Sequence, residues 1–227
     1  MEEGTLVEFT RMRNAIARRM VKSKQEAPHF YVANEVEVDA AVAETGRLAA
    51  ESGQRVTLTS LLVSASAAAL REHPELNAVW TEEGLVRMNA INVGVAVALG
   101  DGLIAPALLG CDTLTTLEVS AALRDLVERA RAGKLRGSEM TGATFTLSNL
   151  GMFEVNAFAA IVTPPQVAIL ATGKASRVPR YDGDELVPRT VLTATLSADH
   201  RAVDGAEVGR FMNTFKRTLE NPTLLDD

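Results

Sequence analysis

A histidine and an aspartate four residues apart, near the carboxyl end of the chain, form the pattern best suited to acid–base chemistry. His200 and Asp204 lie in the polar segment 197–205. An imidazole has an unperturbed pKa of about 6.5, so it can take a proton from a thiol or a hydroxyl near neutral pH with little tuning. The chain has 3 histidines, and His200 has the surroundings most typical of a general base.

Asp204 also has a purely structural interpretation. Asp204 and Glu207 have the spacing of a capping box, in which the first residue caps a helix and the second bonds back to it. His200 would then be a hydrogen-bonded loop histidine. Spacing alone favours this interpretation, because capping boxes are common and general bases are few.

Ser148 is the second residue that could take part in chemistry. It follows the strand-like run 144–147 and precedes Asn149-Leu150-Gly151, a composition that turns the chain. Its hydroxyl can be a nucleophile, a hydrogen-bond donor to an oxyanion, or a turn former. The glycines of a serine-hydrolase nucleophile elbow are absent around it, which disfavours the first role.

Periodicity predicts the elements that must position these residues. Apolar residues at helical spacing predict helices over about 10–25 and 58–69 and a last helix over about 208–219, and Asp112 is expected to cap a further helix that carries Leu114 and Leu117. Alternation predicts strands near 30–38, 91–97, 144–148, 166–172 and 190–197. Interspersed strands and helices without a strict repeat predict an α/β chain of the α+β type, with a mixed sheet packed against helices.

Composition places bounds on the class of protein. The chain has 227 residues with 47% hydrophobic content, enough for one large domain. A net charge of −6 argues against nucleic acid as a partner. The single cysteine, Cys111, permits no internal disulfide and fits a reducing compartment. No apolar run suggests a membrane span, so a cytoplasmic or organelle-matrix location is expected.

Asp199-His200-Arg201 followed by Val203-Asp204-Gly205 resembles the DHRxxDG signature of the dihydrolipoamide acyltransferases, the core component of 2-oxo acid dehydrogenase complexes. Further stretches resemble the same family in order along the chain, from about residue 9 to residue 225. They are Arg18-Arg19-Met20, Pro28-His29-Phe30-Tyr31, Gly102-Leu103-Ile104-Ala105-Pro106, Thr144 to Gly151, Pro164 to Leu170, and Leu219-Glu220-Asn221-Pro222.

The resemblance implies a two-layer, chloramphenicol-acetyltransferase-like fold and a direct thioester exchange. His200 would accept the thiol proton of coenzyme A or dihydrolipoamide, Ser148 would donate a hydrogen bond to the tetrahedral intermediate, and Asp204 would orient the local turn. It also implies a homotrimer in which the histidine of one subunit faces the serine of its neighbour, and this trimer can assemble further into a hollow cage.

Coenzyme A and a lipoyl group are the substrates that the resemblance implies, and no metal is expected. The first predicted helix is basic, so Arg18 and Arg19 are candidates to bind the phosphates of coenzyme A. A solvated or intersubunit helix face is the favoured alternative for most of these side chains. His29 lies near the substrate channel by resemblance, although a structural role is the safer interpretation.

We expect an extension over residues 1–8 and a catalytic domain over residues 9–227, with no lipoyl or peripheral-subunit-binding domain. The lipoyl group would then come from another domain or chain, and the expected partners are the 2-oxo acid dehydrogenase and dihydrolipoamide dehydrogenase components. Ser148 favours acetyl or branched-chain over succinyl transfer. Leu224 and Leu225 are a candidate contact for cage assembly, opposed by the charges of Asp226 and Asp227.

Two other interpretations stay open at this point. The chain can be an acyltransferase of the same fold that uses coenzyme A and a different small acceptor, as chloramphenicol acetyltransferase does. It can also be a mainly structural assembly core.

Overall fold

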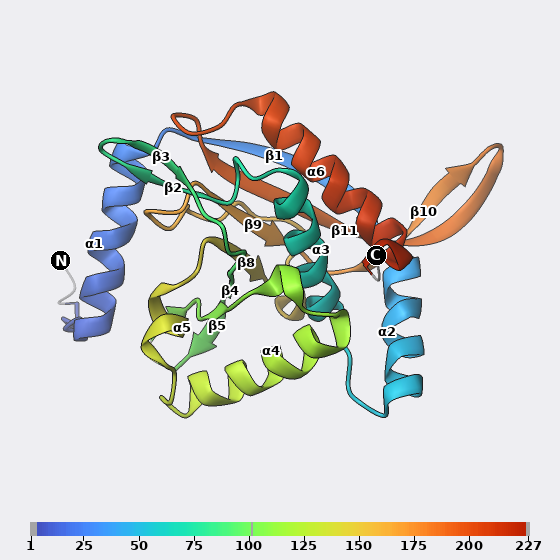
Figure 1. Cartoon of the computed structure of the whole chain (residues 1–227), viewed down its shortest axis with the longest axis horizontal. Helices are drawn as coiled ribbons and strands as arrows, with labels where there is room; N and C mark the ends of the chain where they lie inside the picture. The colour runs from blue at the N-terminus through green and yellow to red at the C-terminus, as the bar shows by residue number, and fades with distance from the viewer. Residues whose placement is uncertain (1–3, 101, 226–227) are drawn as a thin grey trace.

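The computed structural model describes residues 4–100 and 102–225 and is built on one mixed sheet (Figure 1). Within these residues the sheet has seven strands in the order β1-β11-β9-β8-β4-β7, and β10 pairs with β11 outside this path. β8 is parallel to both β4 and β9, and the other pairings are antiparallel. The strands are β1 (His29–Glu37), β4 (Val93–Val95), β7 (Ala107–Leu108), β8 (Phe145–Asn149), β9 (Ala168–Thr172), β10 (Ser176–Asp182) and β11 (Glu185–Asp199).

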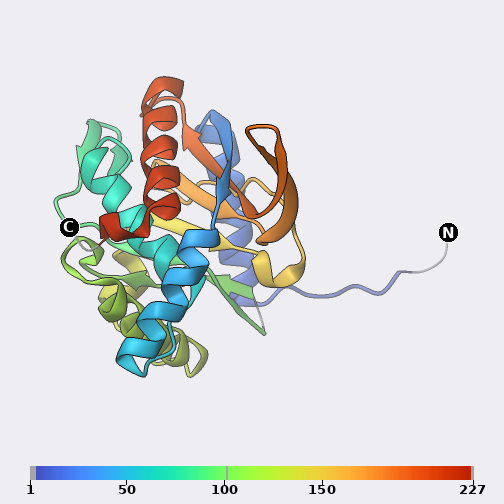
Figure 2. The ribbon, with the colours of Figure 1, turned by 90° about the vertical axis from the view of Figure 1, so that its right-hand side faces the viewer.

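Four helices cover one face of this sheet, as the two orthogonal views show (Figures 1 and 2). They are α2 (Asp39–Ser52), α3 (Leu58–Glu72), α4 (Thr116–Arg131) and α6 (Gly205–Glu220). The core lies between the sheet and these helices, where Phe211 and Phe215 of α6 are fully buried. The Phe211 ring lies 5.7 Å from that of Phe145 in β8, and truncation of such a side chain to alanine costs about 3–5 kcal/mol.

The remaining elements lie around this body. α1 (Arg11–Glu26) packs beside a small hairpin of β5 (Val97–Leu99) and β6 (Gly102–Ile104), and β2 (Ala78–Thr81) pairs with β3 (Gly84–Arg87). A Cβ added at Gly102 would lie 3.2 Å from Ile16 of α1, so this contact is close. Short helices complete the fold: α5 (Gly137–Thr141), η1 (Cys111–Thr113), η2 (Gly151–Phe153) and η3 (Pro222–Leu225).

Two predictions about local structure are wrong for identifiable reasons. The strand expected over 91–97 is divided, because β4 pairs with β8 in the main sheet while β5 pairs with β6 in a separate one, and the chain passes from one sheet to the other at Ala96. Asp112 does not cap α4. Thr115 is the N-cap and forms a capping box with Glu118, whereas the Asp112 carboxylate accepts from the backbone N–H of Ile91 at 3.3 Å.

The two leucines of the candidate assembly contact differ in their surroundings. Leu225 packs against the hydrophobic core and is only partly buried, so it contributes to the fold of its own chain. Leu224 is 39% exposed. Asp226 and Asp227 lie outside the described residues. Among the helices of the described ranges, none is both long and apolar enough to cross a membrane.

Candidate active site

His200 lies in the tight turn between β11 and α6. β11 ends at Asp199, which is paired with His29 at the start of β1, and the His200 backbone N–H donates to the Pro28 carbonyl at 3.0 Å. The imidazole is exposed and packs on the Phe30 ring, with 4.4 Å between ring centroids. Within the described residues its ring nitrogens have no hydrogen-bond partner, so the imidazole is held by packing and by its backbone.

The two neighbours of His200 form a clamp around it. Arg201 donates to the Asp199 carboxylate from its backbone N–H at 3.0 Å, from Nε at 3.0 Å, and from a terminal guanidinium nitrogen at 2.6 Å. Asp199 is 2% exposed, and its hydrogen bond raises the pKa of Arg201 above its usual value. The guanidinium also lies 4.5 Å from the centre of the Trp80 ring. Because Trp80 belongs to β2, the clamp ties the histidine turn to a remote hairpin.

Asp204 performs the capping role expected from its spacing. Its Oδ1 accepts from the backbone N–H groups of Ala206 and Glu207 at 2.8 and 2.9 Å, and Glu207 accepts from the Asp204 N–H at 2.8 Å. The bonds that the carboxylate accepts, first from the Glu207 N–H and then from the Ala206 N–H, hold the pKa of Asp204 below its usual value. The charge of His200 contributes a smaller effect in the same direction. Asp204 is therefore an anion that fixes the start of α6 close to the imidazole.

Ser148 is the fourth residue of β8 and is 8% exposed. Phe145 and Leu147 belong to the hydrophobic core, so alternation along the strand places Thr146 and Ser148 on the sheet face opposite the helices. The hydroxyl thus lies on a face that none of α2, α3, α4 or α6 covers. It is positioned by a buried strand, which is the rigid support that a hydrogen-bond donor in a catalytic site requires.

The strand register separates Ser148 from His200 within one chain. Ser148 is opposite Ala171, and Ala171 is opposite Thr195, five residues before His200. Two strand spacings give about 10 Å across the sheet, and five residues give about 16 Å along β11. The two Cα atoms are therefore about 19 Å apart, too far for one substrate atom to contact both side chains.

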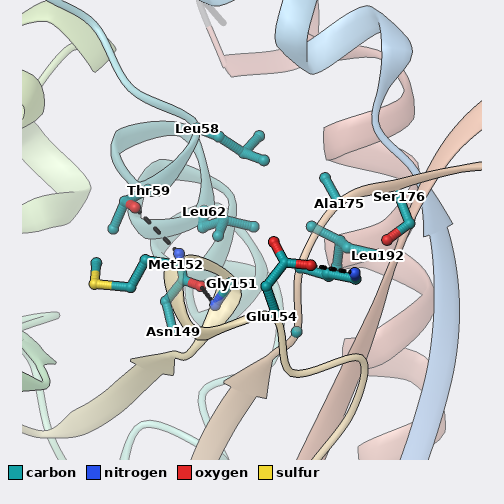
Figure 3. A pocket seen from close by; sticks show the side chains of 12 residues that line it. Leu58, Thr59, Leu62, Asn149, Gly151, Met152, Glu154, Ala175, Ser176 and Leu192 are labelled. Carbon is teal, nitrogen blue, oxygen red and sulfur yellow. Dashed lines mark hydrogen bonds and ion pairs between the residues drawn. The ribbon is translucent and has the colours of Figure 1, made fainter.

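A cavity of about 330 Å³ opens one residue beyond Ser148. Its wall includes Asn149, whose side-chain N–H donates to the Thr59 hydroxyl at 3.1 Å, and Leu58, the first residue of α3. Lys174, just after β9, supplies a positive charge. Figure 3 shows Asn149, Thr59, Met152, Glu154 and Leu192 around this cavity. The sequence analysis did not predict a site here, because a single lysine after a strand or a threonine at the start of a helix carries no distinguishing pattern.

The three residues considered for coenzyme A binding have mixed placements. Arg19 donates to the Pro164 carbonyl at 2.6 Å, so part of its binding capacity is used within the chain, while Arg18 lies exposed on α1. His29 Nδ1 lies 2.7 Å from the Ala27 carbonyl, and its Nε2 accepts from the Val162 N–H at 3.0 Å. His29 thus joins the α1–β1 turn to the segment that precedes β9. None of the three lines the cavity beside Ser148, and their role toward coenzyme A stays a prediction.

Among residues 4–100 and 102–225, no group of three or more His, Cys, Asp and Glu side chains is arranged to hold a metal ion. Cys111 is buried, its thiol donates to the Leu108 carbonyl at 3.1 Å, and burial raises its pKa to about 11. The cysteine therefore fits a packing role rather than that of a nucleophile.

Comparison with known proteins identifies the family. The sequence model of the 2-oxoacid dehydrogenases acyltransferase catalytic domain matches residues 1–226. The dihydrolipoyllysine-residue acetyltransferase component of the pyruvate dehydrogenase complex of Rhizobium meliloti is 38% identical over 224 residues, which are 96% of this chain and 50% of that protein. The chain spans about half the length of the curated relatives it matches.

Solved structures agree with this assignment. The Azotobacter vinelandii dihydrolipoamide acetyltransferase, in which a serine, a histidine and an asparagine were investigated for their catalytic roles, has a TM-score of 0.93 at 32% identity and covers 98% of this chain and 94% of its own. The cubic core of a pyruvate dehydrogenase multienzyme complex has a TM-score of 0.93 at 33% identity, with the same coverage. A chloramphenicol acetyltransferase has a TM-score of 0.55 at 14% identity over 89% of this chain and 94% of its own, which confirms the predicted fold. The chain belongs to the 2-oxoacid dehydrogenase acyltransferase family and spans its catalytic domain.

Proposed function

We propose that this chain transfers an acetyl group between coenzyme A and a dihydrolipoyl group, with His200 as general base and Ser148 as donor to the tetrahedral intermediate. The observation that carries the proposal is a shared spacing. In the Azotobacter protein the investigated serine and histidine are 52 residues apart and the histidine and asparagine are four apart. Ser148 and His200 are also 52 residues apart, and Asp204 follows His200 by four.

The reaction needs no acyl-enzyme. The imidazole of His200 takes the proton of the acceptor thiol as its sulfur attacks the thioester carbonyl carbon. The carbonyl oxygen becomes negative, and the Ser148 hydroxyl donates a hydrogen bond to it, a contribution of about 3 kcal/mol for a well-placed donor. The intermediate collapses with loss of the other sulfur, which receives the proton back from the imidazolium. Removal of the proton matters because an ordinary thiol is only a few per cent ionised at pH 7.

The separation of His200 and Ser148 within one chain supports a site formed between two copies of the chain. His200 and Ser148 of one chain are about 19 Å apart by strand register, so we assign the two groups of each active site to adjacent subunits of a homotrimer. The segment before α1 supplies an apolar surface for association: it runs away from the body (Figure 2) and exposes Leu6 by 87%, Val7 by 75% and Phe9 by 63%. Such a segment is stabilised by packing on a neighbour.

The cavity next to Ser148 suits coenzyme A. The cavity is lined by Leu58, Thr59 and Leu62 of α3 and so lies on the helix-covered side of the sheet, whereas the Ser148 hydroxyl lies on the other side. The phosphate groups at one end of coenzyme A would bind in the cavity, and its flexible pantetheine arm would pass the carboxyl end of β8 to bring the thiol to Ser148. Lys174, about three residues or 10 Å along the chain from the level of Ser148, and the amino-terminal end of α3 both favour an anion there. We assign the phosphate end of coenzyme A to this cavity. The lipoyl group would come from another domain or chain.

The wider assembly extends the same proposal. One structural relative is the cubic core of a pyruvate dehydrogenase complex, so a cage built from trimers is the expected higher assembly. The 2-oxo acid dehydrogenase and dihydrolipoamide dehydrogenase components are the expected partners. Analytical ultracentrifugation measures this directly, because a trimer has three times the chain mass of 24.2 kDa and a cage far more.

The deciding experiment is acyl transfer from acetyl-, isobutyryl- and succinyl-coenzyme A to free dihydrolipoamide, followed by thiol loss. We expect acetyl to be preferred and His200→Ala to lower turnover by at least about 100-fold. Transfer by the parent that His200→Ala leaves unchanged would remove His200 from the mechanism. No transfer to dihydrolipoamide by an assembled trimer would favour a different acceptor or a structural core.

A further inference from the structure

Glu154 has an unusual backbone conformation at the rim of the cavity. It is the one non-glycine residue of the described ranges with a positive φ, at φ 58° and ψ 24°. L-residues with a side chain rarely adopt this left-handed region, and they keep it only where the surrounding structure enforces it. A glycine would adopt this conformation without strain, so the presence of a glutamate here calls for an explanation from its contacts.

The contacts of Glu154 place its charge on the cation of the cavity. Its Oε2 lies 2.6 Å from Lys174 Nζ, and Figure 3 shows this carboxylate directed across the cavity with the ion pair marked. The backbone is held as well: the Lys174 N–H donates to the Val155 carbonyl at 2.7 Å, and a Cβ at Gly173 would lie 1.9 Å from the Asn156 carbonyl oxygen. The loop is thus pressed onto the chain beside Lys174, which fixes the turn at Glu154.

The charge balance of the cavity follows from this pair. Of the residues that line the cavity, Lys174 and Glu154 are the two with charged side chains. The Lys174 side chain is 28% exposed and that of Glu154 is 81% exposed. The lysine is therefore held at the wall, whereas the glutamate reaches it from solvent and can swing away at little cost.

We propose that the Glu154 carboxylate competes with a ligand phosphate for Lys174. By occupying the position of that phosphate, the carboxylate sets how tightly the cavity holds phosphate-bearing thiols. This inference rests on the assignment of coenzyme A to the cavity. An incoming phosphate displaces the carboxylate, and the carboxylate takes the lysine back when the product leaves. Affinity for the anionic end of the substrate is lowered and release is favoured, with no effect on the thiol end.

The test compares Glu154→Gln with the parent by isothermal titration at low salt. Three probes are titrated: coenzyme A, pantetheine, which lacks the phosphates, and inorganic pyrophosphate, which lacks the arm. We expect coenzyme A and pyrophosphate to bind about two- to fivefold more tightly to Glu154→Gln, the range for loss of one exposed ion pair. Pantetheine should bind equally to both proteins. The gain should shrink at high salt, because exposed charges are screened.

Matched variants separate charge from other effects. In the Lys174→Gln background, Glu154→Gln should change nothing, because the contested cation is gone. Glu154→Gly removes both charge and strain, so it should match Glu154→Gln in affinity while melting at a higher temperature. Asp182→Asn, which breaks an exposed ion pair with Arg189 on the β10–β11 hairpin, should leave all three affinities unchanged.

The outcomes distinguish the two proposals. Pyrophosphate and coenzyme A that bind no more tightly to Glu154→Gln than to the parent would overturn the competitor role, as would an equal gain for pantetheine. A parent that binds pyrophosphate but not coenzyme A would instead contradict the substrate assignment, and the pyrophosphate comparison would still decide the role of Glu154.

Discussion

Mixed assemblies of two inactive variants should regain activity. His200 and Ser148 of one chain are about 19 Å apart, as judged from two strand spacings across the sheet and five residues along β11. In the proposed mechanism both groups act on the same thioester, so one of them is assigned to a second copy of the chain. In a cyclic trimer, every mixed assembly of His200→Ala and Ser148→Ala chains contains one site that has both native residues, so we expect about a third of parental turnover.

The assay uses two co-expressed variants with different affinity tags. Tandem purification retains only mixed trimers, and acetyl transfer from acetyl-coenzyme A to dihydrolipoamide is then measured against each pure variant. Each pure variant should retain about 1% of parental turnover or less, since a lost base or oxyanion donor costs about 100-fold or more. The turnover of the mixed trimers should thus exceed that of either pure variant by about 30-fold.

Two results would contradict this reasoning. Mixed trimers no more active than the pure variants would mean that each site uses a histidine and a serine of one chain, so that the chain rearranges by far more than the register allows. Full activity in either pure variant would show that the altered residue takes no part in the reaction. A doubly substituted chain, mixed with the parent, serves as the control for assembly.

Three further predictions concern the residues around the base and one buried ion pair. Arg201→Lys, which loses the forked contact to the Asp199 carboxylate, should lower kcat about ten- to hundredfold with little change in KM, because the displaced turn misplaces the base. Asp204→Ala should lower Tm, because the N-cap of α6 is lost, whereas Asp204→Asn should leave Tm unchanged, because asparagine caps a helix equally well. Hydrogen bonds from Arg129 lower the pKa of Glu139 to about 2 in the folded protein. The ionised carboxylate therefore stabilises the fold at pH values above 4.5, the ordinary pKa of a glutamate in the unfolded chain. Its contribution is lost as pH falls from about 4.5 to about 2, so the Tm deficit of Glu139→Gln should be full at pH 7 and absent near pH 2.

Controls for these predictions are available in the chain. Arg129→Lys makes the same chemical change as Arg201→Lys in an ion pair of α4, so it should lower Tm without an effect on kcat. An equal loss of kcat in both variants would reduce the Arg201 effect to general destabilisation. For Asp204, a kcat of Asp204→Asn below about a tenth of the parental value would show that the carboxylate charge itself serves His200.

Local patterns predicted most of the long helices and several strands. α1, α3 and α6 lie where apolar residues recur at helical spacing, and the capping box at Asp204 was readable from two residues three apart. The patterns failed where partners decide the structure. β10 and the first part of β11 form a protruding hairpin whose exposed, charged sequence lacks alternation (Figure 1). α2 was not predicted, because its apolar stripe is weak. Ala41 and Leu48 are its buried residues.

The sequence by itself determined the family, because its motifs occur in order along the chain, and it supplied His200, Ser148 and Asp204 as the groups proposed to carry the chemistry. Tertiary structure alone decided how those groups relate in space. Strand order and register are set by contacts between segments far apart in sequence, and they place Ser148 on β8 and His200 just after β11, with β9 between these two strands. Pairings such as Arg201 on Trp80 and Glu154 on Lys174 likewise depend on which loops the folded sheet brings together, and no local pattern encodes them.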